Sequence, residues 1–110
     1  MHTGWSMLKR APLLLALFSF FAQAQNVAEV RIETYKYFPA EISIKVGDSV
    51  RWANREKRTS HSVVFPAENG LESERIFPDE VWVRRFDKVG RYDYHCGPHP
   101  EMKGSVVVAE

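Results

Sequence analysis

The chain has 110 residues, of which 15 are lysine or arginine and 14 are aspartate or glutamate, so its formal net charge is +1 with neutral histidines. This nearly balanced charge argues against nucleic acid as a partner, because nucleic-acid-binding domains carry an excess of basic residues. The chain has one cysteine, Cys96, and therefore forms no internal disulfide.

The first 24 residues have the pattern of a secretory signal peptide. Lys9 and Arg10 form a positively charged start, an apolar run of eleven residues follows, and Ala22-Gln23-Ala24 is a small-x-small cleavage site. The apolar run is well short of the roughly 20 residues that span a bilayer, which argues against an uncleaved membrane anchor. We therefore expect cleavage after Ala24, export to the periplasm and no stable membrane insertion.

Residues 25–110 then form a single domain. Loss of Lys9 and Arg10 leaves 13 basic residues (15 minus 2) against 14 acidic ones, a net charge of −1. Exported domains of this size often rely on disulfides, which one cysteine cannot provide. A bound metal is the next obvious source of stability, and it would also protect the thiol from oxidation.

Short strands are predicted along the whole of this domain. In chain order the strand-like runs are AEVRI (28–32), EISIKV (41–46), SVRWAN (49–54), HSVVF (61–65), EVWVRRF (80–86), RYDYHC (91–96) and SVVVAE (105–110). The segment 66–78 is expected to be an exposed loop with a short helical turn. Several short strands without a helical period predict an all-β fold, an antiparallel sandwich or barrel.

The segment YDYHCGPHPEMKG, residues 92–104, contains a thiol, two imidazoles and a thioether. Strand alternation places Tyr94 and Cys96 on one face and His95 on the other. The thiol should therefore lie at the end of a strand and at the edge of the core. We expect His95 to point away from any site built around that thiol.

His99 and Met102 follow Cys96 by three and six residues, so a short turn can gather their side chains around one centre. Thiolate and thioether are soft ligands, and two histidines and a cysteine with a weak axial methionine form electron-transfer copper sites. Structural zinc would have little use for the methionine. His61 is expected to supply the second imidazole, because the other histidines leave with the signal peptide or point away.

These features resemble the cupredoxins, the small blue copper proteins that include plastocyanins and azurins, and among them the amicyanins. The resemblance is carried by YKYFPAEISIKVGDSVRWAN (35–54), HSVVF (61–65) and GRYDYHCGPHPEMKGSVVV (90–108). Cys-x2-His-x2-Met is the compact ligand loop of amicyanins. The resemblance implies a Greek-key cupredoxin domain with one copper, held by His61, Cys96 and His99 in a plane and by Met102 on the axis.

The resemblance also implies that Asn54 braces the ligand loop by hydrogen bonds and that electrons pass through His99 at the surface. The implied activity is one-electron transfer by a monomer, between a dehydrogenase donor and a c-type cytochrome acceptor. Glu101 departs from the amicyanins, which carry a bulky apolar residue there, and its carboxylate favours a partner with basic residues. If the basic loop 55–58 lies at the same end, the docking face carries both signs.

Two other functions use similar residues. A periplasmic copper-delivery or storage protein could have the same donors, but such sites are open and rich in methionine or histidine, and this chain has three methionines. The other alternative is a structural sandwich, or a binding module that has lost its metal. A catalytic copper needs an open coordination position or a second metal, and residues 25–110 offer only His95 in addition, which argues against an enzyme.

Overall fold

The computed structural model describes residues 25–110. The expected signal peptide and its cleavage site lie outside the described residues. Among the residues that are described, no helix has the length and apolar character needed to cross a membrane.

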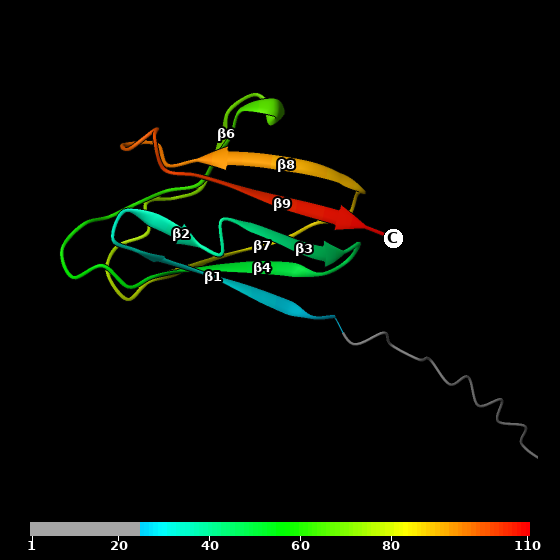
Figure 1. The fold of residues 1–110 in the computed structure, drawn as a ribbon, viewed down its shortest axis with the longest axis horizontal. Coiled ribbons are helices and arrows are strands. Elements are labelled where there is room, and N and C mark those ends of the chain that lie inside the picture. The colour runs from blue at the N-terminus through cyan, green and yellow to red at the C-terminus, as the bar shows by residue number, and fades with distance from the viewer. Residues whose placement is uncertain (1–24) are drawn as a thin grey trace, which may run out of the picture.

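Within residues 25–110, nine strands form two sheets that pack face to face (Figure 1). The first sheet has the order β2-β1-β4-β7, with β1 at Val27–Glu33, β2 at Lys36–Phe38, β4 at Ser49–Asn54 and β7 at Val81–Arg85. The second has the order β3-β9-β8-β5-β6, with β3 at Glu41–Lys45, β5 at Val64–Phe65, β6 at Leu71–Glu72, β8 at Gly90–His95 and β9 at Lys103–Ala109. The predicted all-β sandwich is confirmed.

Both sheets are mixed. Strand β1 pairs in parallel with β4, and β3 pairs in parallel with β9, whereas the other neighbours are antiparallel. Parallel neighbours cannot be joined by a tight hairpin, so the chain crosses between the sheets before it returns. Hydrophobic alternation along a strand shows which of its side chains face the core. It does not show whether the neighbouring strand runs parallel or antiparallel, so the two parallel pairs could not be predicted from the sequence.

Aromatic side chains from both sheets meet in the core. Trp52 of β4 is fully buried and lies edge-on to Tyr94 of β8, with ring centroids 5.4 Å apart, and near Phe65 of β5 at 6.3 Å. The ring of Tyr94 lies directly against Gly104 of β9, where a Cβ atom would overlap with the phenol. Glycine is therefore required at this position because it leaves room for a core ring.

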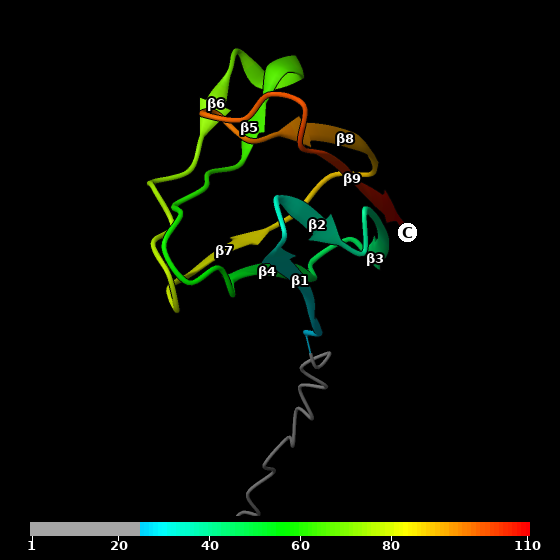
Figure 2. The same ribbon diagram turned by 60° about the vertical axis from the view of Figure 1, so that its left-hand side comes forward.

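The segment 66–78 contains the predicted helical turn, a 3₁₀-helix η2 at Pro66–Glu68, followed by the short strand β6. Asn69 and Gly70 both have left-handed backbones, with φ of 58° and 73°, and turn the chain back along β5. Figure 2 shows this hairpin beside the loop that follows β8. At the other end of β8, Tyr92 donates its hydroxyl to the carbonyl of Lys88 at 2.8 Å.

Candidate metal centre

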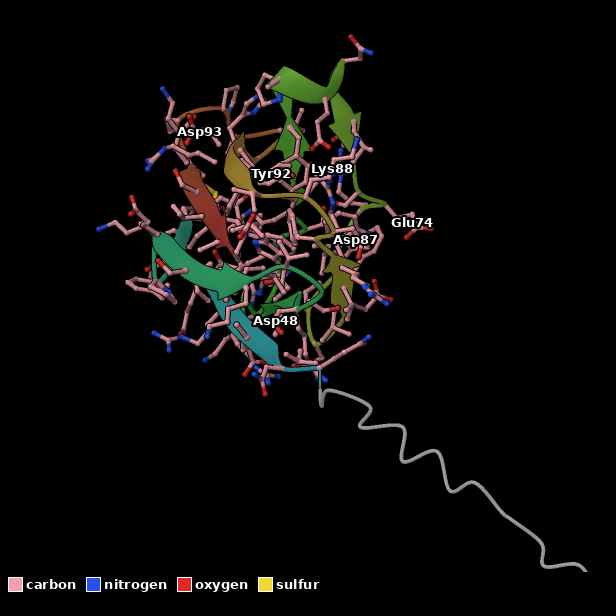
Figure 3. The ribbon with its side chains drawn as sticks, turned by 90° about the vertical axis from the view of Figure 1, so that its right-hand side faces the viewer. Asp48, Glu74, Asp87, Lys88, Tyr92 and Asp93 are labelled. Carbon is pink, nitrogen blue, oxygen red and sulfur yellow. The ribbon has the colours of Figure 1, made fainter. Side chains whose placement is uncertain are left out.

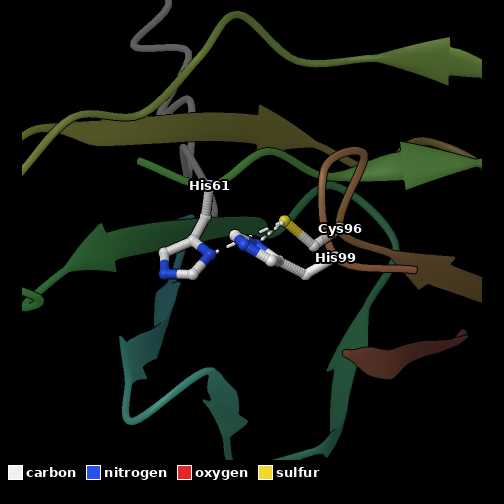
Figure 4. Close-up of side chains that lie close together, drawn as sticks. All are labelled: His61, Cys96 and His99. Carbon is white, nitrogen blue, oxygen red and sulfur yellow. Dashed lines mark hydrogen bonds between the residues drawn. The ribbon is translucent and has the colours of Figure 1, made fainter. Parts of the chain in front are cut away.

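One imidazole from a loop and two donors from a turn meet at one end of the sandwich. His61 lies between β4 and β5, whereas Cys96 and His99 follow β8. In the described part of the chain, these three residues bring one donor atom each to within 4.8 Å of one another. The Cys96 Sγ atom is 3.6 Å from Nδ1 of His61 and 3.7 Å from Nδ1 of His99 (Figure 4).

These distances fit a bound metal ion. Metal–sulfur bonds of about 2.3 Å and metal–nitrogen bonds of about 2.0 Å, at angles of about 110–120°, place the two donor atoms roughly 3.5–3.7 Å apart. The two observed sulfur–nitrogen distances fall in this range. A thiolate with two imidazoles is a set that suits copper. The residues present therefore fit the copper that the sequence analysis predicted.

The turn after β8 is closed by two backbone hydrogen bonds. Cys96 N donates to the carbonyl of Met102 at 3.0 Å, and Met102 N donates to the carbonyl of His99 at 2.9 Å. His99 is thus held at the partly exposed tip, while the Met102 side chain returns to the core and is 3% exposed. Pro98 and Pro100 flank His99 and limit the backbone freedom of the tip.

His61 is fully buried, and its backbone forms two hydrogen bonds with Ile76. Its Nε2 atom is 3.0 Å from Oε2 of Glu56. Donation from Nε2–H to this carboxylate leaves the lone pair of Nδ1 free to face Cys96, which is the tautomer that a ligand needs. Burial lowers the pKa of His61, and Glu56 offsets part of this effect, so the imidazole is held neutral.

The sequence analysis did not identify Glu56. Its only signal was one acidic residue within the basic loop that leads to His61. Position along the chain could not show which loop carboxylate reaches an imidazole, because this depends on how residues 55–60 fold back.

Asn54 ends β4 and is fully buried. Its Nδ2 atom donates to the carbonyls of Thr59 at 2.9 Å and Ile76 at 2.8 Å, and its Oδ1 atom accepts from Glu56 N at 2.8 Å. One side chain thus holds both segments that flank His61. These bonds agree with the bracing role that the family resemblance implied.

Tyr35 covers the site from the turn between β1 and β2. It and the residue before it have left-handed backbones, with φ of 57° and 51°. Its N–H donates to the Glu56 carboxylate at 2.8 Å, and its ring is edge-on to His99 at 4.9 Å and to His61 at 5.5 Å between centroids. The sequence analysis also missed this residue, since left-handed tyrosine is rare and has no sequence signature.

The environment of the Cys96 sulfur is polar on one side. Ser62 N donates to Sγ at 3.4 Å, and the hydroxyl of Tyr37 donates to the Ser62 carbonyl at 2.6 Å. Burial raises the pKa of Tyr37 far above its ordinary value, and the nearby Cys96 raises it further. The Tyr37 hydroxyl therefore keeps its proton and remains a hydrogen-bond donor.

His95 contributes no donor atom to the cluster of His61, Cys96 and His99. Its Nδ1 atom is 3.1 Å from the carbonyl oxygen of Cys96.

Replacing Asn54 tests its bracing role. Asn54→Ala removes the three hydrogen bonds of a fully buried side chain and should lower the free energy of unfolding of the metal-free protein by about 2–4 kcal/mol. Urea titration measures this change. Asn26→Ala is the control, because Asn26 is exposed and, among residues 25–110, only its backbone is hydrogen-bonded. This variant should change stability by less than about 0.5 kcal/mol. Equal values for the two variants would contradict the bracing role.

The chain is similar to known copper proteins. The family model of copper binding proteins, plastocyanin/azurin family, matches residues 24–109. Amicyanin of Paracoccus denitrificans is 40% identical over 89 residues, which cover 77% of this chain and 67% of that protein. Plastocyanin of Tetradesmus obliquus is 32% identical over 103 residues, which cover 79% and 70%. A solved reduced Cu(I) form of an amicyanin mutant at pH 4 matches with a TM-score of 0.71 and 40% identity, over 74% of this chain and 81% of that one.

Proposed function

This chain belongs to the plastocyanin/azurin family of copper-binding proteins, and on that premise we propose that it is a periplasmic type 1 blue copper protein that carries single electrons between redox proteins. Members of the family bind one type 1 copper and are electron carriers rather than enzymes. The observation that carries the proposal is the cluster of His61, Cys96 and His99, with donor atoms at metal-binding distances.

In this proposal His61, Cys96, His99 and Met102 are the residues that would hold the copper. Bound copper supplies one-electron chemistry by alternating between Cu(I) and Cu(II). The hydrogen bonds of Asn54 keep the ligand positions the same in both oxidation states, so little rearrangement accompanies transfer. His99 is the ligand that is partly exposed, which makes it the point where electrons enter and leave.

A copper-delivery or storage protein is the alternative. Delivery needs a site from which the metal can leave, and storage sites hold several ions. Here two of the three clustered donors are fully buried, and the loop that carries His61 is held by hydrogen bonds from the fully buried Asn54. This enclosed site favours an electron carrier.

We further propose that the signal peptide, residues 1–24, is cleaved after Ala24 and that residues 25–110 act as one monomeric cupredoxin domain in the periplasm. The signal pattern and the amicyanin resemblance support this location. The same resemblance supports a dehydrogenase as electron donor and a c-type cytochrome as acceptor.

The exposed cations on and beside the loop that leads to His61 suggest the charge of such partners. Lys57, Arg58 and Arg75 are exposed, and within residues 25–110 none of them forms an ion pair. Lys57 and Arg58 lie in the loop that reaches His61, and Arg75 donates to Ser60 in the same loop at 3.0 Å. With Glu101 and the exposed Glu72 included, the three cations and two carboxylates sum to a charge of +1. We propose an acidic docking surface on the partner, rather than the basic one that Glu101 alone suggested.

Cys96→Ser tests the central assignment. A hydroxyl is a poor soft ligand, so this variant should lose the intense blue absorption of the Cu(II)–thiolate pair and most of its copper affinity. Visible spectra and copper titrations measure both. A delivery protein that binds Cu(I), or a sandwich without metal, would show no blue band in the unmodified protein. A serine variant that stays blue would mean that Cys96 is not the thiolate ligand.

Copper should stabilise the fold strongly. A ligand that binds only the folded chain adds RT ln(1 + [L]/Kd), about 4 kcal/mol when free metal exceeds Kd a thousandfold. In a domain this small, 1 kcal/mol corresponds to ~4–8 °C, so the melting temperature should rise by more than about 10 °C. Calorimetry of metal-free and copper-loaded protein measures the difference. Equal melting temperatures would indicate adventitious binding.

The proposed docking charge can be tested with small oxidants of opposite sign. Oxidation of the reduced protein by hexacyanoferrate(III), an anion, should slow as salt is added, whereas oxidation by tris(phenanthroline)cobalt(III), a cation, should accelerate. The double change Lys57→Glu and Arg58→Glu should slow the hexacyanoferrate(III) reaction about tenfold at low salt.

The control for this experiment changes the same charge elsewhere. Its two substitutions are Arg85→Glu and Lys88→Glu. Lys88 lies with Asp87 at the opposite end of the sandwich, which faces the viewer in Figure 3, and Arg85 Nε is 2.7 Å from Oδ1 of Asp87. This pair should leave the rates nearly unchanged. Equal slowing by both double variants would show that overall charge decides the rate, and would contradict a local docking surface.

A further inference from the structure

Ser62 is fully buried, and each of its polar groups is engaged. Its N–H donates to Sγ of Cys96 at 3.4 Å, and its carbonyl accepts from Tyr37 at 2.6 Å. Its hydroxyl donates to Oε2 of Glu72 at 2.8 Å and accepts from the N–H of Gly97 at 2.9 Å. Ser62 therefore joins the thiol, the backbone that follows it and a carboxylate.

Backbone pairing places Glu72 at this point. In the β5–β6 pair, Glu72 is opposite Val64. The register continues past the strand ends, because Ser73 N donates to the carbonyl of Val63 at 2.9 Å and Val63 N donates to Oγ of Ser73 at 3.0 Å. The Glu72 side chain is thus directed to Ser62 by the hairpin, even though the residue is exposed.

Gly97 leaves room for this carboxylate. A Cβ atom at Gly97 would overlap with Oε2 of Glu72 and would lie 2.8 Å from Oγ of Ser62. The backbone of Gly97 is not left-handed, so its conformation does not call for glycine. The space that a side chain at position 97 would fill is therefore occupied by Glu72.

We propose that Glu72 is a positioning residue of the copper site, which acts through Ser62 on the backbone beside Cys96 and whose negative charge favours the oxidised state. This inference rests on the proposed copper function. It extends the site beyond the ligands and the bracing Asn54, to a residue on β6 whose side chain, within residues 25–110, is hydrogen-bonded to Ser62 and to none of the four proposed ligands.

The positioning effect follows from the hydrogen-bond directions. A carboxylate is a strong acceptor, so the Ser62 hydroxyl proton points to Glu72 and an oxygen lone pair faces the N–H of Gly97. Polarisation by the first bond strengthens the second. The Gly97 peptide, and with it the position of Cys96, is held by this chain of bonds.

The charge effect follows from Coulomb attraction. The oxidised site carries one more positive charge than the reduced site, so a nearby carboxylate stabilises the oxidised state more and lowers the reduction potential. Because Glu72 is exposed, solvent and salt weaken this effect.

Two variants separate the effects. Glu72→Gln removes the charge but keeps an oxygen acceptor for Ser62, whereas Glu72→Ala removes both. Glu74→Gln and Glu74→Ala are matched controls, because Glu74 is an exposed carboxylate two residues away that projects to solvent in Figure 3, and its side chain forms no hydrogen bond or ion pair within residues 25–110.

Two measurements are made on each variant. Hydrogen exchange of the Gly97 amide, followed by NMR in the metal-free and the reduced copper-loaded protein, should be on the order of tenfold faster in Glu72→Ala and nearly unchanged in Glu72→Gln. The reduction potential should be higher in both Glu72 variants than in the matched Glu74 variants, and the difference should shrink as salt is added.

The outcomes are distinguishable. Gly97 exchange in Glu72→Ala that equals exchange in Glu74→Ala would overturn the positioning role, and reduction potentials that equal those of the Glu74 variants would overturn the role of the charge. If the unmodified protein binds no copper and shows no blue band, the proposed function fails, while Gly97 exchange in the metal-free protein still decides whether Glu72 positions this backbone.

Discussion

The structure around the proposed metal centre depends on one constraint: Cys96 and His61 are fully buried at the end of the sandwich, where no water can satisfy neighbouring polar groups. An unpaired buried donor or acceptor costs about 1–3 kcal/mol, so each must find a protein partner. Asn54 and Ser62 supply these partners on the two sides of His61. The ligand loops are held in place by hydrogen bonds to the fully buried residues Asn54 and Ser62.

This constraint also explains how exposure is divided among the ligands. His61 enters from a loop that is bonded to Ile76 and covered by Tyr35, whereas His99 comes from a turn that the backbone of Met102 closes. The first arrangement excludes solvent, and the second brings an imidazole to the surface at the tip of a short turn. The site is closed to water and still has one side from which an electron can leave.

The sequence predicted the features that are set locally. Strand alternation placed Cys96 beside Tyr94 and turned His95 away, and the Cys-x2-His-x2-Met spacing predicted the compact turn. It could not predict Glu56, Tyr35 or Glu72, because each reaches the site through a turn geometry or a strand register that depends on distant residues. It also missed Arg75 as a cation beside the loop that carries His61, since Arg75 comes from a different segment.

The parallel pairing of β3 with β9 has a consequence for how the domain folds. Glu41 is opposite Ser105, so the strands that close this sheet are far apart in the chain, and contacts of this kind form slowly because a long loop must be ordered first. Until then Cys96 is an unprotected thiol in an oxidising compartment, if the chain is exported as we propose. Copper that arrives only after folding finds an arranged donor set, whereas copper or an oxidant that arrives earlier finds a reactive sulfur. Because of this topology, the amount of copper-loaded protein should depend on whether folding is complete before copper binds.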